Sequence, residues 1–175
     1  MKFILNIFIA ILFTINSALA LIDTDADTAI IMDADTGYIL YEKNSNQKTF
    51  PASMTKIMTS MIVFEKLSNG SLTLDDKFLV SEKAWKEREG SSMFVEVDKE
   101  IRVEDLLRGI IVQSGNDACI VVAENISGSE ETFSILMNEM AVDIGLENTS
   151  FANSTGMHSV KNYSTVADIA KMSQY

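Results

Sequence analysis

A serine and a lysine three positions apart are the first residues in this sequence that could do chemistry together. Ser53 and Lys56 follow Pro51, where the spacing of apolar residues predicts the start of a helix. Residues i and i+3 of a helix share one face, with Cβ atoms about 5–6 Å apart, so the lysine amine can reach the serine hydroxyl. A neutral amine can take the hydroxyl proton, and the positive end of the helix dipole favours that neutral form. The pair predicts a nucleophilic serine with a lysine base.

The same spacing occurs a second time, at Ser45 and Lys48. In a chain of this length and ordinary composition, roughly one such match is expected by chance. Ser45 and Lys48 lie in a polar stretch between two predicted elements, where nothing fixes one side chain relative to the other. We therefore assign the nucleophile to Ser53 and the base to Lys56.

A second polar group, Ser114-Gly115-Asn116, separates two helical patterns that would otherwise run together. A tight connection of this kind presents its side chains at the surface. Taken alone, these residue types are typical of an ordinary helix–helix turn. Together with the Ser53 and Lys56 pair, they indicate a second wall of one catalytic site.

The elements that must position these residues can be predicted from apolar periodicity and turn chemistry. Two short apolar segments around a turn at residues 34–37 predict a β-hairpin over 28–41. Helical spacing predicts a helix from Pro51 to the Asn69-Gly70 stop, and further helices over residues 103–113, 117–126 and 130–144. Ser129 is the expected N-cap and Gly145 the expected stop of the last of these. Thr165 and Asp168 predict one more helix start, as a capping box.

The N-terminus has the pattern of a secretory signal. Lys2 precedes an apolar run from Phe3 to Ile15, and small residues follow at positions 18–20. We expect residues 1–20 to be a signal peptide and residues 21–175 to form the mature domain, exported to the periplasm or cell envelope. An uncleaved signal that anchors the protein is the alternative.

Composition excludes several classes of function. The formal net charge of −11, with no cluster of basic residues, argues against nucleic acid as a partner. Cys119 is the only cysteine and His158 the only histidine, so neither an internal disulfide nor a zinc site built from these residue types can form. No metal and no cofactor is expected, and Cys119 lies in an apolar run typical of a buried helix.

Three segments in consistent order resemble the low-molecular-mass penicillin-binding proteins, the D-alanyl-D-alanine carboxypeptidases. They are residues 51–56, residues 90–94 and residues 113–118, and the resemblance continues through 145–156 to 163–165. It implies an α+β fold, the β-lactamase/penicillin-binding-protein-like transpeptidase fold. The predicted hairpin would belong to its central antiparallel sheet, and the helices would form its helical subdomain.

The resemblance also implies a reaction and a role for each site residue. Ser53 would attack a peptidoglycan stem peptide ending in D-Ala-D-Ala, with Lys56 as base. Ser114 would relay a proton to the leaving amine, and Asn116 would hold the substrate amide. β-Lactams would be covalent inhibitors. Gly115 resembles the carboxypeptidases, whereas class A β-lactamases carry Asp at that position, so a serine β-lactamase is the less favoured enzyme.

One part of the family pattern is missing. The family closes its site with a strand bearing Lys-Thr-Gly, and the 175 residues contain no such motif. We therefore expect an incomplete domain, truncated before that strand and without the rest of the central sheet. Membrane association would then require an uncleaved signal or a missing C-terminal anchor. The alternative function is a non-catalytic envelope protein that keeps only part of the fold.

Overall fold

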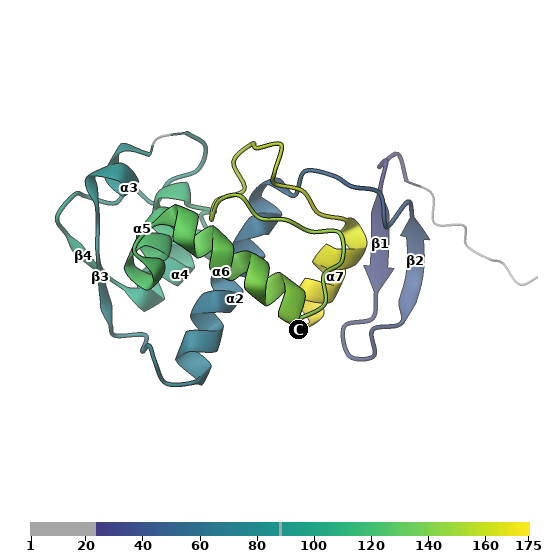
Figure 1. The fold of residues 1–175 in the computed structure, drawn as a ribbon, viewed down its shortest axis with the longest axis horizontal. Coiled ribbons are helices and arrows are strands. Elements are labelled where there is room, and N and C mark those ends of the chain that lie inside the picture. Colours follow the sequence, from purple (N-terminus) through teal and green to yellow (C-terminus); the bar gives the residue numbers. More distant parts are fainter. Residues whose placement is uncertain (1–23, 88) are drawn as a thin grey trace, which may run out of the picture.

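A β-hairpin begins the part of the chain that the computed structural model describes, which is residues 24–87 and 89–175. Strands β1 (Ala29–Met32) and β2 (Ile39–Lys43) pair antiparallel, as predicted, with a register shift between Ile31 and Met32. Gly37, at φ +72°, allows the turn between them. The hairpin forms its own two-stranded sheet at one end of the molecule (Figure 1). The expected signal peptide, residues 1–20, lies outside the described residues.

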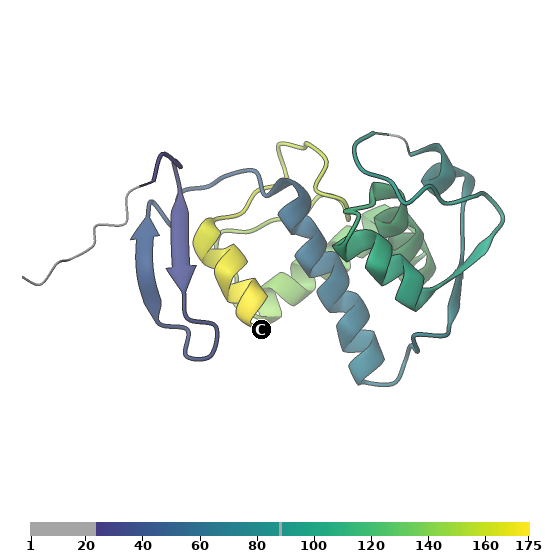
Figure 2. The same cartoon turned by 180° about the vertical axis from the view of Figure 1, so that it is seen from behind.

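The helix that carries the serine and lysine runs through the middle of the molecule (Figure 2). It comprises one 3-10 turn, η1 (Ala52–Met54), followed by α2 (Thr55–Ser68). The prediction of a continuous α-helix from Pro51 was wrong, because Ala52 has φ +47° and interrupts the helical backbone. The predicted end at Asn69 is confirmed.

Three further helices pack beside α2, and their predicted positions are confirmed with small changes at the ends. They are α4 (Val103–Ile111), α5 (Asn116–Ser127) and α6 (Glu130–Asp143). The α4 helix ends two residues earlier than predicted, before a turn in which Ser114 has φ +57°. Residues 118–123 of α5 are all at most 2% exposed, as their uninterrupted apolar run predicted. Ser129 caps α6 by accepting a hydrogen bond from the Thr132 amide (3.0 Å).

A second small sheet and a short helix were not predicted from the sequence. Strands β3 (Lys77–Leu79) and β4 (Glu100–Arg102) pair antiparallel, and α3 (Glu82–Lys86) lies between them in the chain. Each strand has only three residues, which is too short for an alternating pattern to be recognised. Strand β3 and α3 both contact α5, so this region covers the side of α5 away from the hairpin.

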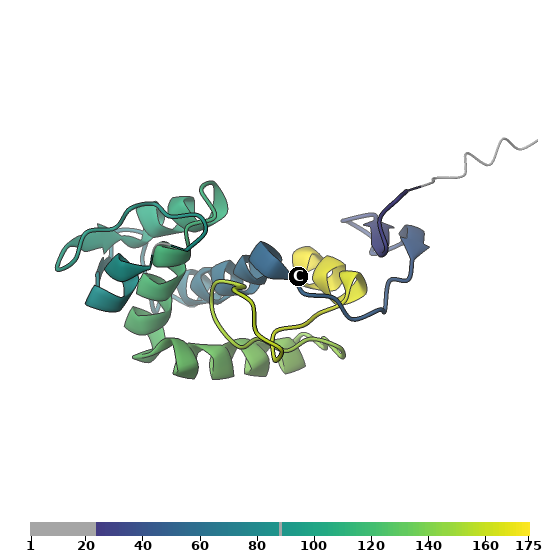
Figure 3. The same cartoon turned by 90° about the horizontal axis from the view of Figure 1, so that it is seen from above.

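The last helix, α7 (Val166–Gln174), lies between β1 and α2, as its yellow ribbon shows in Figure 3. Thr165 caps it by accepting a bond from the Asp168 amide (3.1 Å), as predicted. The other half of the predicted capping box was wrong. The Asp168 carboxylate accepts bonds from the Asn148 amide (2.8 Å) and the Thr149 hydroxyl (2.7 Å) instead, and so ties α7 to the preceding loop.

The core between these helices gives a test of the packing. Phe133 on α6 is fully buried, whereas Ile135 on the same helix is 59% exposed. We expect Phe133→Ala to lower the free energy of unfolding by about 3–5 kcal/mol, because it removes buried contacts and leaves a cavity. Ile135→Ala should change it by about 0.5 kcal/mol or less. Urea unfolding of the two variants measures the difference, and equal losses would contradict this packing.

Candidate active site

Ser53 and Lys56 lie side by side at the head of α2. The Lys56 amine is 3.4 Å from the Ser53 hydroxyl oxygen, a long hydrogen bond. Although Ser53 belongs to the 3-10 turn η1 and Lys56 to α2, the i to i+3 relation predicted from the sequence is kept across this junction. Lys56 is only 5% exposed.

The buried Lys56 amine has a second partner, because it donates a hydrogen bond to the carbonyl oxygen of Thr155 (2.7 Å). Burial lowers the pKa of Lys56, and the nearby Cys119 sulfur opposes this shift. Burial also raises the pKa of Cys119 to about 12, so its thiol is uncharged near neutral pH. No negative charge on Cys119 is then present to stabilise the protonated form of Lys56. Burial therefore shifts Lys56 toward the neutral amine that a general base requires.

The turn that supplies this carbonyl, residues 153–157, is held together by its own side chains. The Asn153 amide oxygen accepts bonds from the Gly156 amide (2.8 Å) and the Thr155 hydroxyl (3.1 Å). The turn is also bound to α2 one helical turn further on, where the Thr59 hydroxyl donates to the Ser154 carbonyl (2.7 Å). Sequence reasoning placed these residues in the family pattern but missed their contact with Lys56.

A glycine allows the turn to approach the serine this closely. Gly156 has φ +83°, and a Cβ atom at this position would overlap the carbonyl oxygen of Ala52, the residue before Ser53. Only a residue without a side chain can bring these two backbone segments together. The available sequence signal was Gly156 itself, in the segment 145–156 that resembles the family.

Two cavities meet at Ser53. One, of about 450 Å³, is lined by Ser53, Lys56 and Ser114 together with apolar residues of α2, α4 and α7. The other, of about 330 Å³, is lined by Ser53, Asn116 and residues of the 155–159 segment, including His158. The structure therefore brings three of the predicted site residues to one cavity and places Asn116 in its neighbour.

The Ser114-Gly115-Asn116 turn packs tightly against the loop at residues 89–95. The Asn116 backbone amide donates to the Ser91 carbonyl (2.8 Å), and the Asn116 side-chain amide donates to the Glu89 carbonyl (2.8 Å). Asn116 is 4% exposed. The backbone of Gly115 lies so close to this loop that an added Cβ would be 3.2 Å from the Met93 nitrogen.

Asp117, which sequence reasoning missed, fixes the same loop. Its buried carboxylate accepts bonds from the Ser92 hydroxyl (2.6 Å) and from the amides of Met93 (3.0 Å), Val95 (3.1 Å) and Ala118 (2.9 Å). Four donors and the N-terminus of α5 satisfy the buried charge. The available signal was an acidic residue directly before the uninterrupted apolar run of residues 118–123.

The second serine–lysine pair is not a site. The Ser45 hydroxyl donates to the Glu42 carboxylate (2.5 Å), and the Lys48 amine lies over the ring of Tyr163, 4.1 Å from its centre. Each side chain is engaged with a different neighbour. Ser45 and Lys48 therefore do not contact each other as Ser53 and Lys56 do.

No group of three potential metal ligands of the His, Cys, Asp or Glu types occurs among residues 24–87 and 89–175. Within the same residues, no helix combines the length and apolar character that crossing a bilayer would demand.

A serine hydroxyl beside a buried lysine amine, at the head of a central helix, defines a serine–lysine site. The family model described as D-alanyl-D-alanine carboxypeptidase matches residues 14–175. The chain therefore belongs to this family, and the resemblance inferred from the sequence motifs is confirmed.

Individual relatives agree with the family assignment. The chain is 45% identical over 150 residues to the D-alanyl-D-alanine carboxypeptidase DacF of Bacillus subtilis, a match that covers 86% of this chain and 38% of DacF. It is 41% identical over 151 residues to DacC of Escherichia coli, with 83% and 38% covered. The chain thus spans about 38% of the length of these curated relatives.

Solved structures confirm the predicted α+β fold of the penicillin-binding type. The D-alanyl-D-alanine carboxypeptidase DacD from Francisella tularensis superposes with a TM-score of 0.85 at 41% identity, covering 87% of this chain and 37% of that one. Penicillin binding protein 5 from Haemophilus influenzae also gives 0.85, at 37% identity, covering 87% and 45%.

The close approach of Gly156 to Ala52 can be tested with a matched pair of glycines. Gly156 and Gly128 both have positive φ, at +83° and +80°, but nothing lies within 4 Å of a Cβ added at Gly128. Gly128→Ala should cost about 1–2 kcal/mol of unfolding free energy, from backbone conformation alone. Gly156→Ala should cost clearly more, because the Ala52 backbone must also move. Urea denaturation compares them, and equal losses would show that the two backbone segments are not in contact.

Proposed function

We propose that the protein is a serine-type D-Ala-D-Ala carboxypeptidase that acts on peptidoglycan stem peptides through an acyl-enzyme on Ser53. The observation that carries the proposal is the buried Lys56 amine, 3.4 Å from the Ser53 hydroxyl and with a lowered pKa. Family membership supports the same chemistry.

In the first half of the reaction, Ser53 Oγ attacks the carbonyl carbon of the peptide bond between the two D-alanines. The hydroxyl proton passes to Lys56, and the backbone N–H of Ser53 donates to the developing oxyanion. The C–N bond then breaks, and the departing amine of D-alanine takes up a proton delivered through Ser114. The stem peptide remains as an ester on Ser53.

In the second half, water attacks the ester carbonyl and transfers its proton to the base. The C–O bond to Ser53 breaks, the serine hydroxyl regains a proton, and the shortened peptide leaves with a free carboxyl group. Asn116 holds the substrate amide in this proposal, at the wall of the smaller cavity. A β-lactam would follow the first half with its ring amide in place of the peptide bond.

The 175 residues contain the nucleophile and the base that attack on the peptide bond requires. The terminal carboxylate of the substrate leaves with D-alanine, so a cationic donor for this carboxylate acts while the peptide binds and the acyl-enzyme forms. The family pattern gives this role to Lys-Thr-Gly, and that motif does not occur in this sequence. The proposal for the whole protein includes export, with residues 1–20 as signal peptide and residues 21–175 as mature domain in the periplasm or cell envelope.

Labelling with a fluorescent penicillin tests the nucleophile. The protein should form one covalent adduct, mapped by peptide mass to Ser53, and Ser53→Ala should abolish it. Ser45→Ala is the matched control and should label like the parent, because Ser45 is bonded to Glu42. A folded protein that forms no adduct would refute the enzymatic proposal.

Substitution of the base gives a second, graded test. Lys56→Arg keeps the positive charge but cannot supply a neutral base, so the acylation rate should fall about 10²- to 10⁴-fold. Lys48→Arg should leave the rate unchanged.

In the parent protein the acylation rate should rise with pH through the pKa of Lys56, because only the neutral amine accepts the Ser53 proton. Burial lowers that pKa, so the rise should come at lower pH than an exposed lysine would give. Stopped-flow acylation at several pH values measures this, and a rate that falls with rising pH would contradict it.

A further inference from the structure

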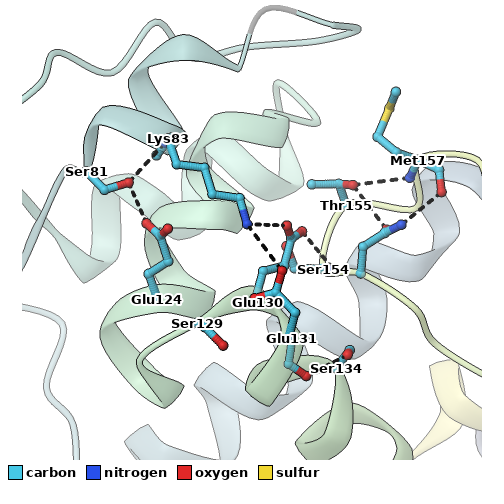
Figure 4. Close-up of polar contacts among 12 residues, drawn as sticks. Ser81, Lys83, Glu124, Ser129, Glu130, Glu131, Ser134, Ser154, Thr155 and Met157 are labelled. Carbon is cyan, nitrogen blue, oxygen red and sulfur yellow. Dashed lines mark hydrogen bonds and ion pairs between the residues drawn. The ribbon is translucent and has the colours of Figure 1, made fainter.

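The side chain of Glu130, at the first residue of α6, connects three separate parts of the molecule (Figure 4). One carboxylate oxygen accepts bonds from the Ser154 hydroxyl (2.7 Å) and the Ser154 amide (3.2 Å). The other oxygen pairs with the Lys83 amine of α3 at 3.1 Å. The Glu130 side chain is 15% exposed and Ser154 is fully buried, so the bonds between them are largely shielded from water, whereas the Lys83 side chain is 47% exposed.

The contact continues from Ser154 to the catalytic lysine. The carbonyl of Ser154 accepts a bond from Thr59, and the carbonyl of the next residue, Thr155, accepts the bond from Lys56. Glu130 thus holds the outer side of the 153–157 turn, while the inner side faces α2. Because Ser154 and Thr155 are adjacent, a shift of one moves the carbonyl oxygen of the other.

The charge on Glu130 suits its position. It lies at the N-terminus of α6, where the helix dipole stabilises a carboxylate. Burial lowers the pKa of Lys83, but its hydrogen bond to Glu130 and the charges of Glu130, Glu131 and Glu124 outweigh this and raise it overall, so Lys83 carries its positive charge near neutral pH.

The next residue, Glu131, differs from Glu130 in its exposure and in its contacts. Glu131 is 81% exposed and approaches Lys83 only to 4.0 Å. Both carboxylates are in the first turn of the same helix, and Glu130 is the one that binds the 153–157 turn.

We propose that Glu130 is a positioning residue that fixes the Thr155 carbonyl, and through it the Lys56 amine, by holding Ser154. This inference rests on the proposed function in that Lys56 is the base. Without the Glu130 carboxylate, the buried hydroxyl and amide of Ser154 lose their acceptor, and buried donors of this kind are costly to leave unpaired. The turn then has to rearrange. A displacement of about 1 Å in a catalytic group can cost as much as ~10²-fold in rate.

The test compares Glu130→Ala, Glu130→Gln and Glu131→Ala by stopped-flow acylation with a fluorescent penicillin. Glu130→Ala should lower the first-order acylation rate constant about 10- to 100-fold, while the final adduct per folded molecule stays the same. Glu130→Gln keeps an oxygen for both Ser154 donors and should restore the rate to within about threefold. Glu131→Ala should match the parent. A purely structural role would lower the amount of adduct and leave the rate constant unchanged.

Hydrogen exchange supplies a readout that does not depend on activity. The amides of Gly156 and Met157 are bonded within the turn, so they should exchange faster in Glu130→Ala but not in Glu130→Gln or Glu131→Ala. If Glu130→Ala and Glu131→Ala behave alike in exchange, the inference is wrong, whatever the activity. If only Glu130→Ala loosens the turn while the parent forms no adduct, the proposed function fails and the positional role of Glu130 stands.

Discussion

The burial of one lysine amine between a serine hydroxyl and a backbone carbonyl is the constraint on which the rest of this structure depends. Lys56 is almost inaccessible to water, and its Nζ atom is shared between Ser53 Oγ at 3.4 Å and Thr155 O at 2.7 Å. A buried amine is stable only if it is hydrogen-bonded or uncharged. The helix head, the 153–157 turn and the apolar face of α5 together provide both conditions, since they remove water and supply one fixed acceptor.

The surrounding backbone is shaped to meet this constraint. Ala52 and Ser114 are non-glycine residues with positive φ, a conformation that costs of order 1–3 kcal/mol each, and both flank the cavities at Ser53. Gly156 lets a segment about a hundred residues further along the chain lie against Ala52. The buried carboxylate of Asp117 fixes the opposite wall in the same way, by collecting donors from the 92–95 loop. Strain at the site is thus offset by the hydrogen bonds of the Asp117 carboxylate and by the packed helices behind it.

Much of this arrangement could be predicted from the sequence, because it depends on local patterns. The hairpin, the helices α2, α4, α5 and α6, the Ser129 cap and the contact between Ser53 and Lys56 all follow from spacing within a few residues. The hydrogen bond from Lys56 to Thr155, and the bonds from the adjacent Ser154 to Glu130, could not be predicted, since these residues meet only through the tertiary fold. The 3-10 turn at Ser53 was missed for the same reason, because Gly156 packs against Ala52 from far along the chain. Strands β3 and β4 were missed because three residues carry too little pattern.

The pKa of the Lys56 amine is the quantity to measure. Protein labelled with ¹³C at the lysine Cε positions can be titrated by NMR, and the Lys56 signal can be assigned by its loss in Lys56→Arg. The account predicts that Lys56 titrates below the exposed lysines, because burial disfavours its charged form. A Lys56 signal that titrates with the exposed lysines, or above them, would contradict the central claim that this site holds a lysine ready to act as a base.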